Sequence, residues 1–305
     1  MTSTSSPIVF FGTETFSLAS LTALVEAGFA IGLVVTKPDS KQGRGHRLTE
    51  PIVKTYAAAH NIPVLQPRTT QDIIDAITPL TQPTGVLVSY GKIIPQAVID
   101  VFPYGIVNVH PSLLPRYRGP SPIESAIVHG DTETGISLMQ LSARMDAGPI
   151  YKQTRYALNG AETAYELSEY MAQHGARELV QTLPAILDGS LRPTPQDDKR
   201  ATYCSLLAKS DGMIDWHMPA VDIERRVRAY IEWPKSRTTI AGLDCVITKA
   251  SVVNITSETP GSVVADKHTL RISTGDGWLM IHRLKPAGKK EMPIQAFLAG
   301  YQSLR

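Results

Sequence analysis

The chain lacks the features that mark several common protein classes. Only two cysteines occur among 305 residues, Cys204 and Cys245, and they lie far apart without a metal-ligand pattern. This argues against a disulfide framework and against structural zinc. No apolar run approaches the length of a membrane span, and Thr2 to Pro7 carry no basic side chain, so neither membrane insertion nor secretion is expected. We therefore expect a cytoplasmic protein with no membrane partner.

Two catalytic motifs are missing as well. The first apolar segment, Ile8 to Phe11, is followed by Gly12-Thr13-Glu14 rather than by Gly-x-Gly-x-x-Gly, which argues against NAD dependence. Gly-x-Ser-x-Gly, the nucleophile elbow of serine hydrolases, is also absent. A reaction through a covalent serine or cysteine intermediate is therefore not expected.

Charge is nearly balanced overall but unevenly distributed. The net charge is +2, yet residues 1–204 carry 16 basic against 18 acidic side chains, whereas residues 205–305 carry 14 against 10. A modestly basic carboxyl-terminal part fits a phosphate-rich partner, although a solvated surface explains the charge count equally well. The length and a hydrophobic content of 43% are typical of a globular protein with two domains.

The first part of the chain alternates between short β-branched apolar runs and helical segments. This order is typical of an α/β fold with a doubly wound, Rossmann-like, mostly parallel sheet whose ligands bind at the carboxyl ends of the strands. The expected strands are residues 8–11, 31–36, 64–65, 85–89, 106–109 and 136–141, and the expected helices are residues 15–27, 52–60, 72–77, 95–101, 122–129 and 161–187.

The last third of the chain has a different pattern. A Pro-containing, charged stretch at residues 190–205 indicates a linker, and one helix is expected at residues 220–231. Turn-separated strands are typical of a small antiparallel, OB-like β-barrel and are expected at residues 238–240, 244–250, 261–265, 269–273 and 278–284. The predicted organisation is a catalytic domain at 1–189, a linker at 190–205 and a barrel domain at 206–305.

Asn108 and His110 are the most informative polar residues, because they share one face at the end of an expected strand. An amide donor beside an imidazole suits the stabilisation of an oxyanion on a tetrahedral carbon. Asp146, in a later loop, can orient the imidazole or accept a proton. Without a covalent nucleophile, this set indicates acyl transfer by direct attack of the acceptor. The other interpretation is that Asn108 and His110 only satisfy backbone groups at the strand end.

These residues belong to a longer pattern that resembles the formyltransferases that use 10-formyltetrahydrofolate. Asn-x-His is followed by Ser-Leu-Leu-Pro-Arg-Tyr-Arg-Gly at 112–119 and by Asp-x-Gly at 146–148. Six further segments resemble the members of this family that act on methionyl initiator tRNA. They are Lys37-Pro38-Asp39, Gly43-Arg44-Gly45, Ile214-Asp215-Trp216, Arg228-Ala229-Tyr230, Trp233-Pro234 and Pro286-Ala287-Gly288-Lys289-Lys290. The resemblance covers nearly the whole chain, in order.

The resemblance implies substrates and residue roles. The formyl donor is 10-formyltetrahydrofolate, no metal is needed, and the acceptor is the α-amino group of methionyl initiator tRNA. Asn108, His110 and Asp146 are then the catalytic residues. The segments expected to frame the pterin of the folate contain Ser89, Tyr90, Gly91, Ser112, Leu113, Leu114 and Pro115.

Two basic segments are expected to bind the tRNA. The resemblance implies that a flexible loop near the active site grips the acceptor stem through phosphates, using Lys37, Lys41, Arg44 and Arg47. Arg44 matches the family position expected to enter the stem. Lys289 and Lys290 of the second domain are expected to add contacts, and for both segments a solvated surface is the other interpretation. We expect the protein to be a monomer.

Two other functions stay open at this point. Pro111 departs from many tRNA-acting members, and His-Pro-Ser-Leu-Leu-Pro also resembles the glycinamide ribonucleotide formyltransferases. The acceptor is then a small amine, either that nucleotide or a nucleotide-linked amino sugar; the appended domain argues against the former. A noncatalytic tRNA-binding protein is the third possibility, and the intact Asn108, His110 and Asp146 argue against it.

Overall fold

The structure is a computed structural model that describes residues 6–42 and 47–300, without the side chains of Gln42 and Arg47. The chain packs as two compact units. Unit 1 comprises Met1–Pro122, Thr134–Tyr156 and Ser168–Cys204, and unit 2 comprises Ile123–Glu133, Ala157–Leu167 and Ser205–Arg305. The domain boundaries derived from the sequence, at residues 189 and 205, stay a prediction.

A seven-stranded sheet forms the centre of unit 1, in the order β5-β2-β1-β6-β7-β8-β9. The pairs from β5 to β7 are parallel, and β8 runs antiparallel to β7. The predicted doubly wound, mostly parallel sheet is therefore confirmed. Its strands are β1 (Ile8–Gly12), β2 (Ile31–Val35), β5 (Val64–Leu65), β6 (Thr84–Val88), β7 (Ile106–His110), β8 (Glu133–Gln140) and β9 (Ile150–Ala157).

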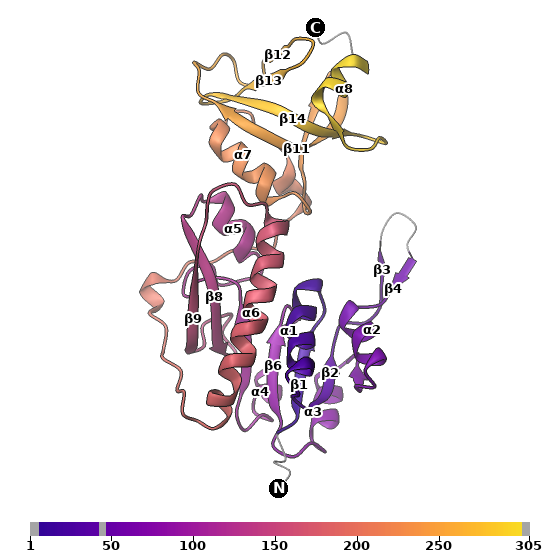
Figure 1. The fold of residues 1–305 in the computed structure, drawn as a ribbon, viewed down its shortest axis with the longest axis vertical. Coiled ribbons are helices and arrows are strands. Elements are labelled where there is room, and N and C mark those ends of the chain that lie inside the picture. Colours follow the sequence, from indigo (N-terminus) through magenta and orange to yellow (C-terminus); the bar gives the residue numbers. More distant parts are fainter. Residues whose placement is uncertain (1–5, 43–46, 301–305) are drawn as a thin grey trace. The chain divides into compact units, whose positions relative to one another are not determined.

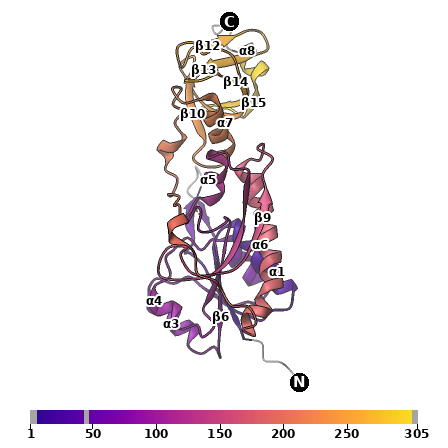
Figure 2. The same ribbon diagram turned by 90° about the vertical axis from the view of Figure 1, so that its left-hand side faces the viewer.

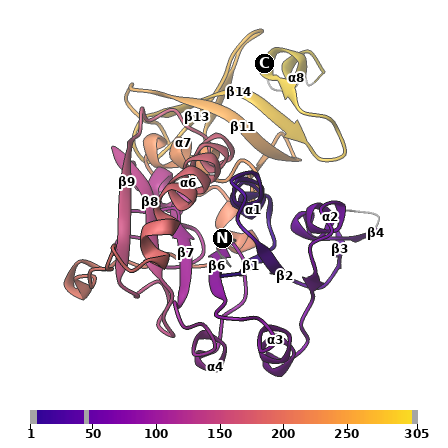
Figure 3. The ribbon, with the colours of Figure 1, turned by 60° about the horizontal axis from the view of Figure 1, so that its bottom comes forward.

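Helices cover both faces of this sheet (Figure 1). Figure 3 shows α1 and α6 on one face and α3 and α4 on the other. All residues of β1 and β7 are buried, as expected for central strands covered on both sides. Up to Leu187 the helices are α1 (Thr15–Glu26), α2 (Ile52–Ala59), α3 (Thr70–Ile77), α4 (Gln96–Ile99), α5 (Pro122–Val128) and α6 (Ala164–Leu187).

Two helix starts differ from the sequence prediction because side chains cap them. Helix α3 begins two residues earlier than expected, since Thr69 and Asp72 form a capping box. Helix α6 begins at Ala164 rather than at residue 161, since Glu166 N donates to Thr163 Oγ1 and the Glu166 carboxylate accepts from Thr163 N. The caps, rather than the apolar spacing, therefore set where each helix starts.

Three elements of unit 1 were not anticipated. The basic segment expected to be a loop contains a short hairpin, with β3 (Ser40–Gln42) antiparallel to β4 (Arg47–Thr49). Strand β9 was missed because charged or polar side chains occur on both of its faces, with Lys152 on one and Gln153 and Arg155 on the other, so no apolar alternation is visible. Charged side chains are common on edge strands, where they discourage pairing with another chain.

Unit 2 contains a curled antiparallel sheet in the order β10-β11-β14-β13-β12, with β15 added to β14. This confirms the predicted carboxyl-terminal barrel-like fold; among the described residues the end strands β10 and β12 do not pair with each other. Its elements are α7 (Ala220–Ala229), β10 (Ser236–Ile240), β11 (Leu243–Val253), β12 (Val263–Ala265), β13 (Leu270–Ser273), β14 (Trp278–Pro286), β15 (Met292–Pro293) and α8 (Ile294–Gly300).

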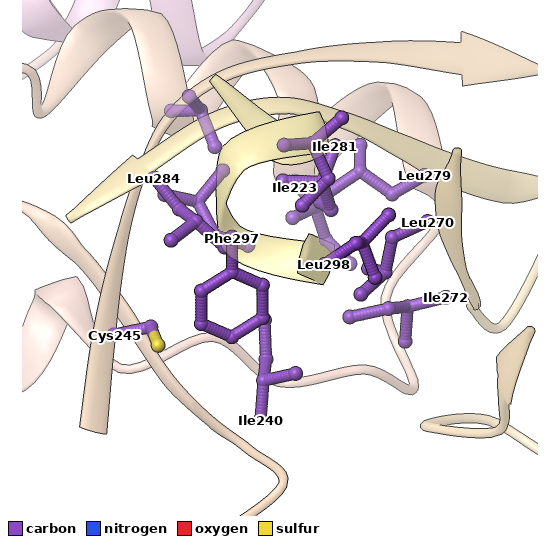
Figure 4. Packing of buried hydrophobic residues seen from close by; sticks show 13 residues of the cluster. Ile223, Ile240, Cys245, Leu270, Ile272, Leu279, Ile281, Leu284, Phe297 and Leu298 are labelled. Carbon is purple, nitrogen blue, oxygen red and sulfur yellow. The ribbon is translucent and has the colours of Figure 1, made fainter. Parts of the chain in front are cut away.

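The core of unit 2 lies between this sheet and its two helices (Figure 2). Helix α8, which the sequence did not reveal, contributes Phe297 and Leu298, both fully buried. Figure 4 shows these side chains among Ile240 of β10, Leu284 of β14 and Leu270 of β13. Helix α7 adds further apolar side chains to the same cluster. The sheet therefore encloses its own hydrophobic core.

The described residues contain neither a clear metal site nor a membrane-spanning helix. No group of three or more His, Cys, Asp or Glu side chains gathers there in a metal-binding arrangement. No helix in the same part of the chain is long and apolar enough to cross a membrane.

Candidate active site

Strand β7 carries the two polar residues predicted to act on the substrate. Val109 faces α6, since a Cβ on Gly175 of that helix would lie 2.8 Å from Val109 Cγ1. Because side chains alternate along a strand, Asn108 and His110 project from the opposite face. Each is only 5% exposed. The sheet therefore holds an amide and an imidazole close together near the carboxyl end of β7.

The loop that follows β7 is tied to strand β8 by short hydrogen bonds. Ser137 Oγ of β8 donates to Ser112 O at 2.6 Å and accepts from Leu114 N at 3.1 Å. Within the loop, Ser112 Oγ donates to Arg116 O at 2.6 Å. These bonds fix the backbone that surrounds the imidazole.

His110 is oriented by a backbone carbonyl. Its Nε2 lies 3.0 Å from Tyr117 O, inside the protein. A carbonyl oxygen can only accept a hydrogen bond, so we assign the proton to Nε2. Nδ1 is then the nitrogen that faces the carboxylate of Asp146, 3.8 Å from its Oδ2. The imidazole can therefore take up a second proton at Nδ1 and donate it toward the site.

Asp146 lies in the loop between β8 and β9. Its φ of 46° is in the left-handed region, which Asp tolerates better than most residues other than glycine. Oδ1 accepts from Asn108 Nδ2 at 3.4 Å, and Oδ2 accepts from the backbone N–H of Gly119 at 2.8 Å. The structure thus brings Asn108, His110 and Asp146 together, while their catalytic roles stay a prediction.

Gly119 is a position where a side chain does not fit. Its φ is +124°, and a Cβ would lie 2.2 Å from the backbone oxygen of Cys204. The absence of a side chain lets the loop pass close to residue 204 while its N–H reaches the Asp146 carboxylate. A larger residue at this position would therefore displace a hydrogen-bond donor of the site.

The first segment expected around the folate directly follows β6, which is parallel to β7. Ser89 and Gly91 both have positive φ, 45° and 70°, and Ser89 Oγ donates to Glu14 Oε2 at 2.9 Å. Tyr90 is 2% exposed, and its ring packs edge-on against Phe11 with the centroids 5.7 Å apart. Its side chain is therefore closed to a ligand, and its carbonyl accepts from Thr13 Oγ1 at 3.0 Å.

The second segment expected around the folate is the loop at 112–115. Ser112 and Leu114 are buried within it, whereas Leu113 and Pro115 are half-buried. The oxygen of Pro115 accepts from Thr202 N at 3.1 Å. The carbonyls of Ser112, Leu113 and Leu114 also accept hydrogen bonds within the protein, and Ser112 N and Leu114 N donate. A ligand would therefore have to share these carbonyl oxygens, each of which has a second lone pair.

The basic residues expected to bind tRNA differ in their surroundings. Lys37 is half-buried beside Gly91, where a Cβ would lie 2.1 Å from its Nζ. Lys41 is exposed on β3. Arg44 lies outside the described residues, and Arg47 begins β4, with only its backbone described. Lys37 is thus next to the folate segment rather than on the hairpin.

Lys289 and Lys290 lie in unit 2, in the connection between β14 and β15. Both are exposed, and the Lys289 N–H donates to Pro286 O at 3.1 Å. Lys285 precedes them on β14 and is exposed too. The turn therefore presents several ammonium groups to solvent.

Lys54 of α2 forms ion pairs at both ends of the β3–β4 hairpin. Lys54 Nζ lies 2.8 Å from Asp39 Oδ2, before β3, and 2.9 Å from Glu50 Oε1, after β4. Gln66 also donates to Asp39 Oδ1 at 2.7 Å. The hydrogen bond from Lys54, followed by that from Gln66, lowers the pKa of Asp39. Glu50 and Lys54 are four residues apart, but Asp39 and Gln66 lie 15 and 27 residues from their partners, so local sequence does not indicate the whole anchor.

Sequence reasoning also missed two residues that organise the site. Gln196 binds the backbone on both sides of the Asp146 turn, and Arg118 is completely buried beside it. Gln196 lies in the predicted linker at 190–205. Nothing in the neighbouring sequence distinguishes it, because its hydrogen-bond partners lie 48 to 78 residues away. For Arg118, its position between Tyr117 and Gly119 in the loop motif is the one signal that the sequence offers.

Comparisons with known proteins identify the fold and the family of the chain. A formyl transferase family model matches residues 7–183, and the model of the formyl transferase carboxyl-terminal domain matches residues 206–302. WlaRD, a sugar 3N-formyl transferase solved in the presence of dTDP and 5-N-formyl-THF, superposes with a TM-score of 0.71 at 20% identity, over 94% of this chain and 99% of that one. At this identity the likeness shows a shared fold.

Sequence relatives narrow the family. A methionyl-tRNA formyltransferase from Chloroflexus aurantiacus is 42% identical over 299 residues, which span 96% of this chain and 96% of the relative. One from Pelobacter propionicus is 39% identical over 296 residues, spanning 96% and 92%. With both family models matched in order along its length, the chain belongs to the methionyl-tRNA formyltransferase family.

Proposed function

We propose that this protein transfers the formyl group of 10-formyltetrahydrofolate to the α-amino group of methionyl initiator tRNA by direct attack. The observation that carries the proposal is the cluster of Asn108, His110 and Asp146 at the end of β7, in a chain that matches its relatives over 96% of its length. No covalent enzyme intermediate is required, because the acceptor is itself a nucleophile.

The acceptor amine needs little activation. An α-amino group has a pKa of about 7.7 to 8.0, so a substantial fraction is neutral at physiological pH. As its nitrogen bonds to the formyl carbon, negative charge develops on the formyl oxygen. Asn108 Nδ2 and a protonated His110 Nδ1 are the two donors that can stabilise this oxyanion. The 3.4 Å bond from Asn108 to Asp146 is long, so the amide can redirect toward the oxyanion.

Proton transfer completes the reaction. The attacking amine must lose a proton, and N10 of the folate must gain one as its bond to the formyl carbon breaks. Asp146 is an acceptor-only group while ionised, and it lies between the amide of Asn108 and the imidazole of His110. We assign it the relay of the proton from the amine toward N10, directly or through His110.

The folate is proposed to lie against the segments at 89–91 and 112–115. A pterin is flat and carries several donors and acceptors along its edge, which suits recognition by backbone N–H and carbonyl groups. The positive φ values of Ser89 and Gly91 turn the chain sharply at the strand end, and the exposed Gly91 permits close approach. The presence of 5-N-formyl-THF in the WlaRD structure supports a folate as the donor.

The tRNA is proposed to be held by basic side chains from both units. Lys37, Lys41, Arg44 and Arg47 would contact the acceptor end, and Lys289 and Lys290 would neutralise phosphates from unit 2. Phosphate contacts position a nucleic acid without reading its sequence, so preference for the initiator tRNA must come from base contacts or shape. We propose that the enzyme acts as a monomer in the cytoplasm, which size-exclusion chromatography and cell fractionation can test.

The direct test is to incubate the purified protein with 10-formyltetrahydrofolate and methionyl initiator tRNA, hydrolyse the ester, and measure the released amino acid by mass spectrometry. We expect formylmethionine. Parallel reactions contain glycinamide ribonucleotide or a nucleotide-linked amino sugar. Formylation of one of these amines alone would replace the proposed acceptor, and tRNA binding without any formylation would contradict catalysis.

A further inference from the structure

The chain from Thr202 to Cys204 is bound along the catalytic loop by hydrogen bonds. Arg118 N donates to Thr202 O at 2.9 Å, and Cys204 N donates to Arg118 O at 2.9 Å. Tyr117 N donates to Thr202 Oγ1 at 2.9 Å. The segment that the sequence indicated as a linker therefore packs against the residues that orient His110, within unit 1.

Gln196 uses its whole amide group in this contact. Its Nε2 donates to Asp146 O at 2.8 Å and to Gly148 O at 2.7 Å. Its Oε1 accepts from Arg118 Nε at 3.1 Å and Nη2 at 2.8 Å. A primary amide has two N–H donors and one carbonyl, so all are engaged. The side chain thus links the Asp146 turn to the loop that carries Tyr117 and Gly119.

The Asp146 turn needs such support because its backbone is strained. A non-glycine residue at a φ of 46° persists only where its surroundings enforce the conformation. Gly148 is equally constrained, since a Cβ there would lie 1.8 Å from Gln140 O. The two bonds from Gln196 hold the carbonyls on either side of Ala147. They therefore fix the direction in which the Asp146 carboxylate points.

Arg118 gives Gln196 a rigid support. Its side chain is completely buried, and its Nη2 pairs with Asp198 Oδ1 at 2.7 Å. Asp198 also receives Arg144 Nη2 at 2.9 Å. The hydrogen bonds from Arg118 and then from Arg144 lower the pKa of Asp198, so this carboxyl stays ionised at neutral pH. The guanidinium is thus charge-balanced and held in one orientation.

We propose that Gln196 is a positioning residue for catalysis. It holds the backbone of the Asp146 turn so that the Asp146 carboxylate stays beside Asn108 and His110, and it does not itself contact the reacting atoms. The inference rests on the proposed function, because it assigns Asp146 a part in the chemistry. Gln196 lies behind the Asp146 backbone and is not proposed to touch either substrate. Its loss should therefore reduce kcat while leaving the KM for both substrates nearly unchanged.

Gln196→Glu separates this role from general structural support. The substitution keeps the side-chain shape and an oxygen that can accept from Arg118, but it replaces the N–H donors with a second carboxylate oxygen facing two carbonyls. The matched control is Asp197→Ala, because Asp197 is the exposed neighbour whose carboxylate accepts from Lys199 N rather than from the catalytic loop. Gln196→Ala, which removes all four bonds, provides a second variant.

The kinetic experiment measures kcat and both KM values for the parent and these variants, with folding checked by circular dichroism and thermal melting. We expect kcat of Gln196→Glu to fall about 10- to 100-fold, the scale that small misplacements of catalytic groups produce. Each KM should stay within about twofold, as expected when only transition-state interactions are lost. Asp197→Ala should match the parent. An unchanged kcat in both Gln196 variants, or a loss confined to KM, would overturn the proposal.

Hydrogen–deuterium exchange supplies a readout that does not depend on activity. Peptides containing residues 117–120 and 144–149 should exchange faster in Gln196→Glu than in the parent or in Asp197→Ala, because the Gly119 N–H loses its fixed acceptor. Unchanged exchange in both Gln196 variants would overturn the positioning role even if kcat fell. If the parent itself formylates no methionyl-tRNA, the proposed function fails, while the exchange result still decides whether Gln196 fixes the turn.

Discussion

The end of β7 and the turn between β14 and β15 present polar side chains in opposite ways. Asn108 and His110 are each 5% exposed; a carbonyl 3.0 Å away orients the imidazole, and a longer bond of 3.4 Å directs the amide toward the Asp146 carboxylate. Lys289 and Lys290 are exposed to solvent. Groups that must meet a developing charge need fixed distances, whereas groups that neutralise a polyanion act over several ångströms and are screened by salt. The first region should therefore control rate, and the second should control affinity.

The largest effect is expected for the donors of the first region. Asn108→Ala removes one proposed oxyanion donor, and the loss of one such donor typically lowers the rate about 10²- to 10³-fold. Asp146→Asn removes the proton acceptor and should lower kcat at least as much. Rates of formylmethionyl-tRNA formation at saturating substrates are the measurement, at low and at high salt. If the loss of rate depended on salt concentration, the end of β7 would not control rate independently of tRNA affinity.

A smaller effect is expected from the charges of the second region. The double variant Lys289→Glu, Lys290→Glu should weaken tRNA binding. It should also reduce the slope of log affinity against log salt by about one to two units, since each phosphate contact contributes about 0.7 to 0.9 to that slope. Filter binding at several salt concentrations measures this slope, and kcat should stay unchanged. If the slope is the same in parent and variant, this turn does not contact the tRNA.

A still smaller effect is expected at the hairpin anchor. Lys54→Met breaks the ion pairs to Asp39 and Glu50 and should loosen both ends of the β3–β4 hairpin. Ion pairs that remain partly accessible to water contribute little, so we expect the KM for methionyl-tRNA to rise only about two- to fivefold. The KM for the folate is the internal control and should not move. An equal rise in both KM values would mean that the hairpin also shapes the folate pocket.

The smallest effect concerns stability in acid. Backbone hydrogen bonds from His268, followed by bonds from Thr269, lower the pKa of Asp266 from 3.8 to about 2. A lowered pKa in the folded state stabilises the protein above the ordinary value, and this contribution disappears as pH falls from 3.8 toward about 2. Asp266→Asn should therefore flatten the fall in unfolding free energy across that window, measured by urea denaturation, without changing formylation at neutral pH. An unchanged pH slope would contradict the assigned hydrogen bonds.

Much of the fold could be predicted because its strands are short β-branched runs that end at turn residues. The strand at Ile31–Val35 is such a run, and it begins at the predicted residue. The helix at Ala220–Ala229 also begins at the predicted residue. The hairpin could not be predicted, since Ser40–Gln42 is a three-residue polar strand with no apolar alternation. Helix α8 has only seven residues, too few for a clear period.

The site divides in the same way. Asn108 and His110 are two residues apart on one strand, so their proximity follows from local geometry alone. Asp146 was placed by resemblance to a family pattern. Gln196 was missed because it acts through backbone carbonyls about 50 residues away, and such contacts leave no mark on local sequence. Sequence therefore predicted the groups that we propose act on the substrate, while the structure revealed the side chain that we propose positions them.

The most direct test of the account is the single-turnover rate of His110→Ala with both substrates saturating and the fold verified. At saturation, tRNA affinity no longer limits the reaction, so the measurement isolates the chemistry assigned to the end of β7. The account predicts that formyl transfer slows about 10²-fold or more and that added salt changes this ratio little. Transfer at a rate close to that of the parent would contradict the assignment of the catalytic site.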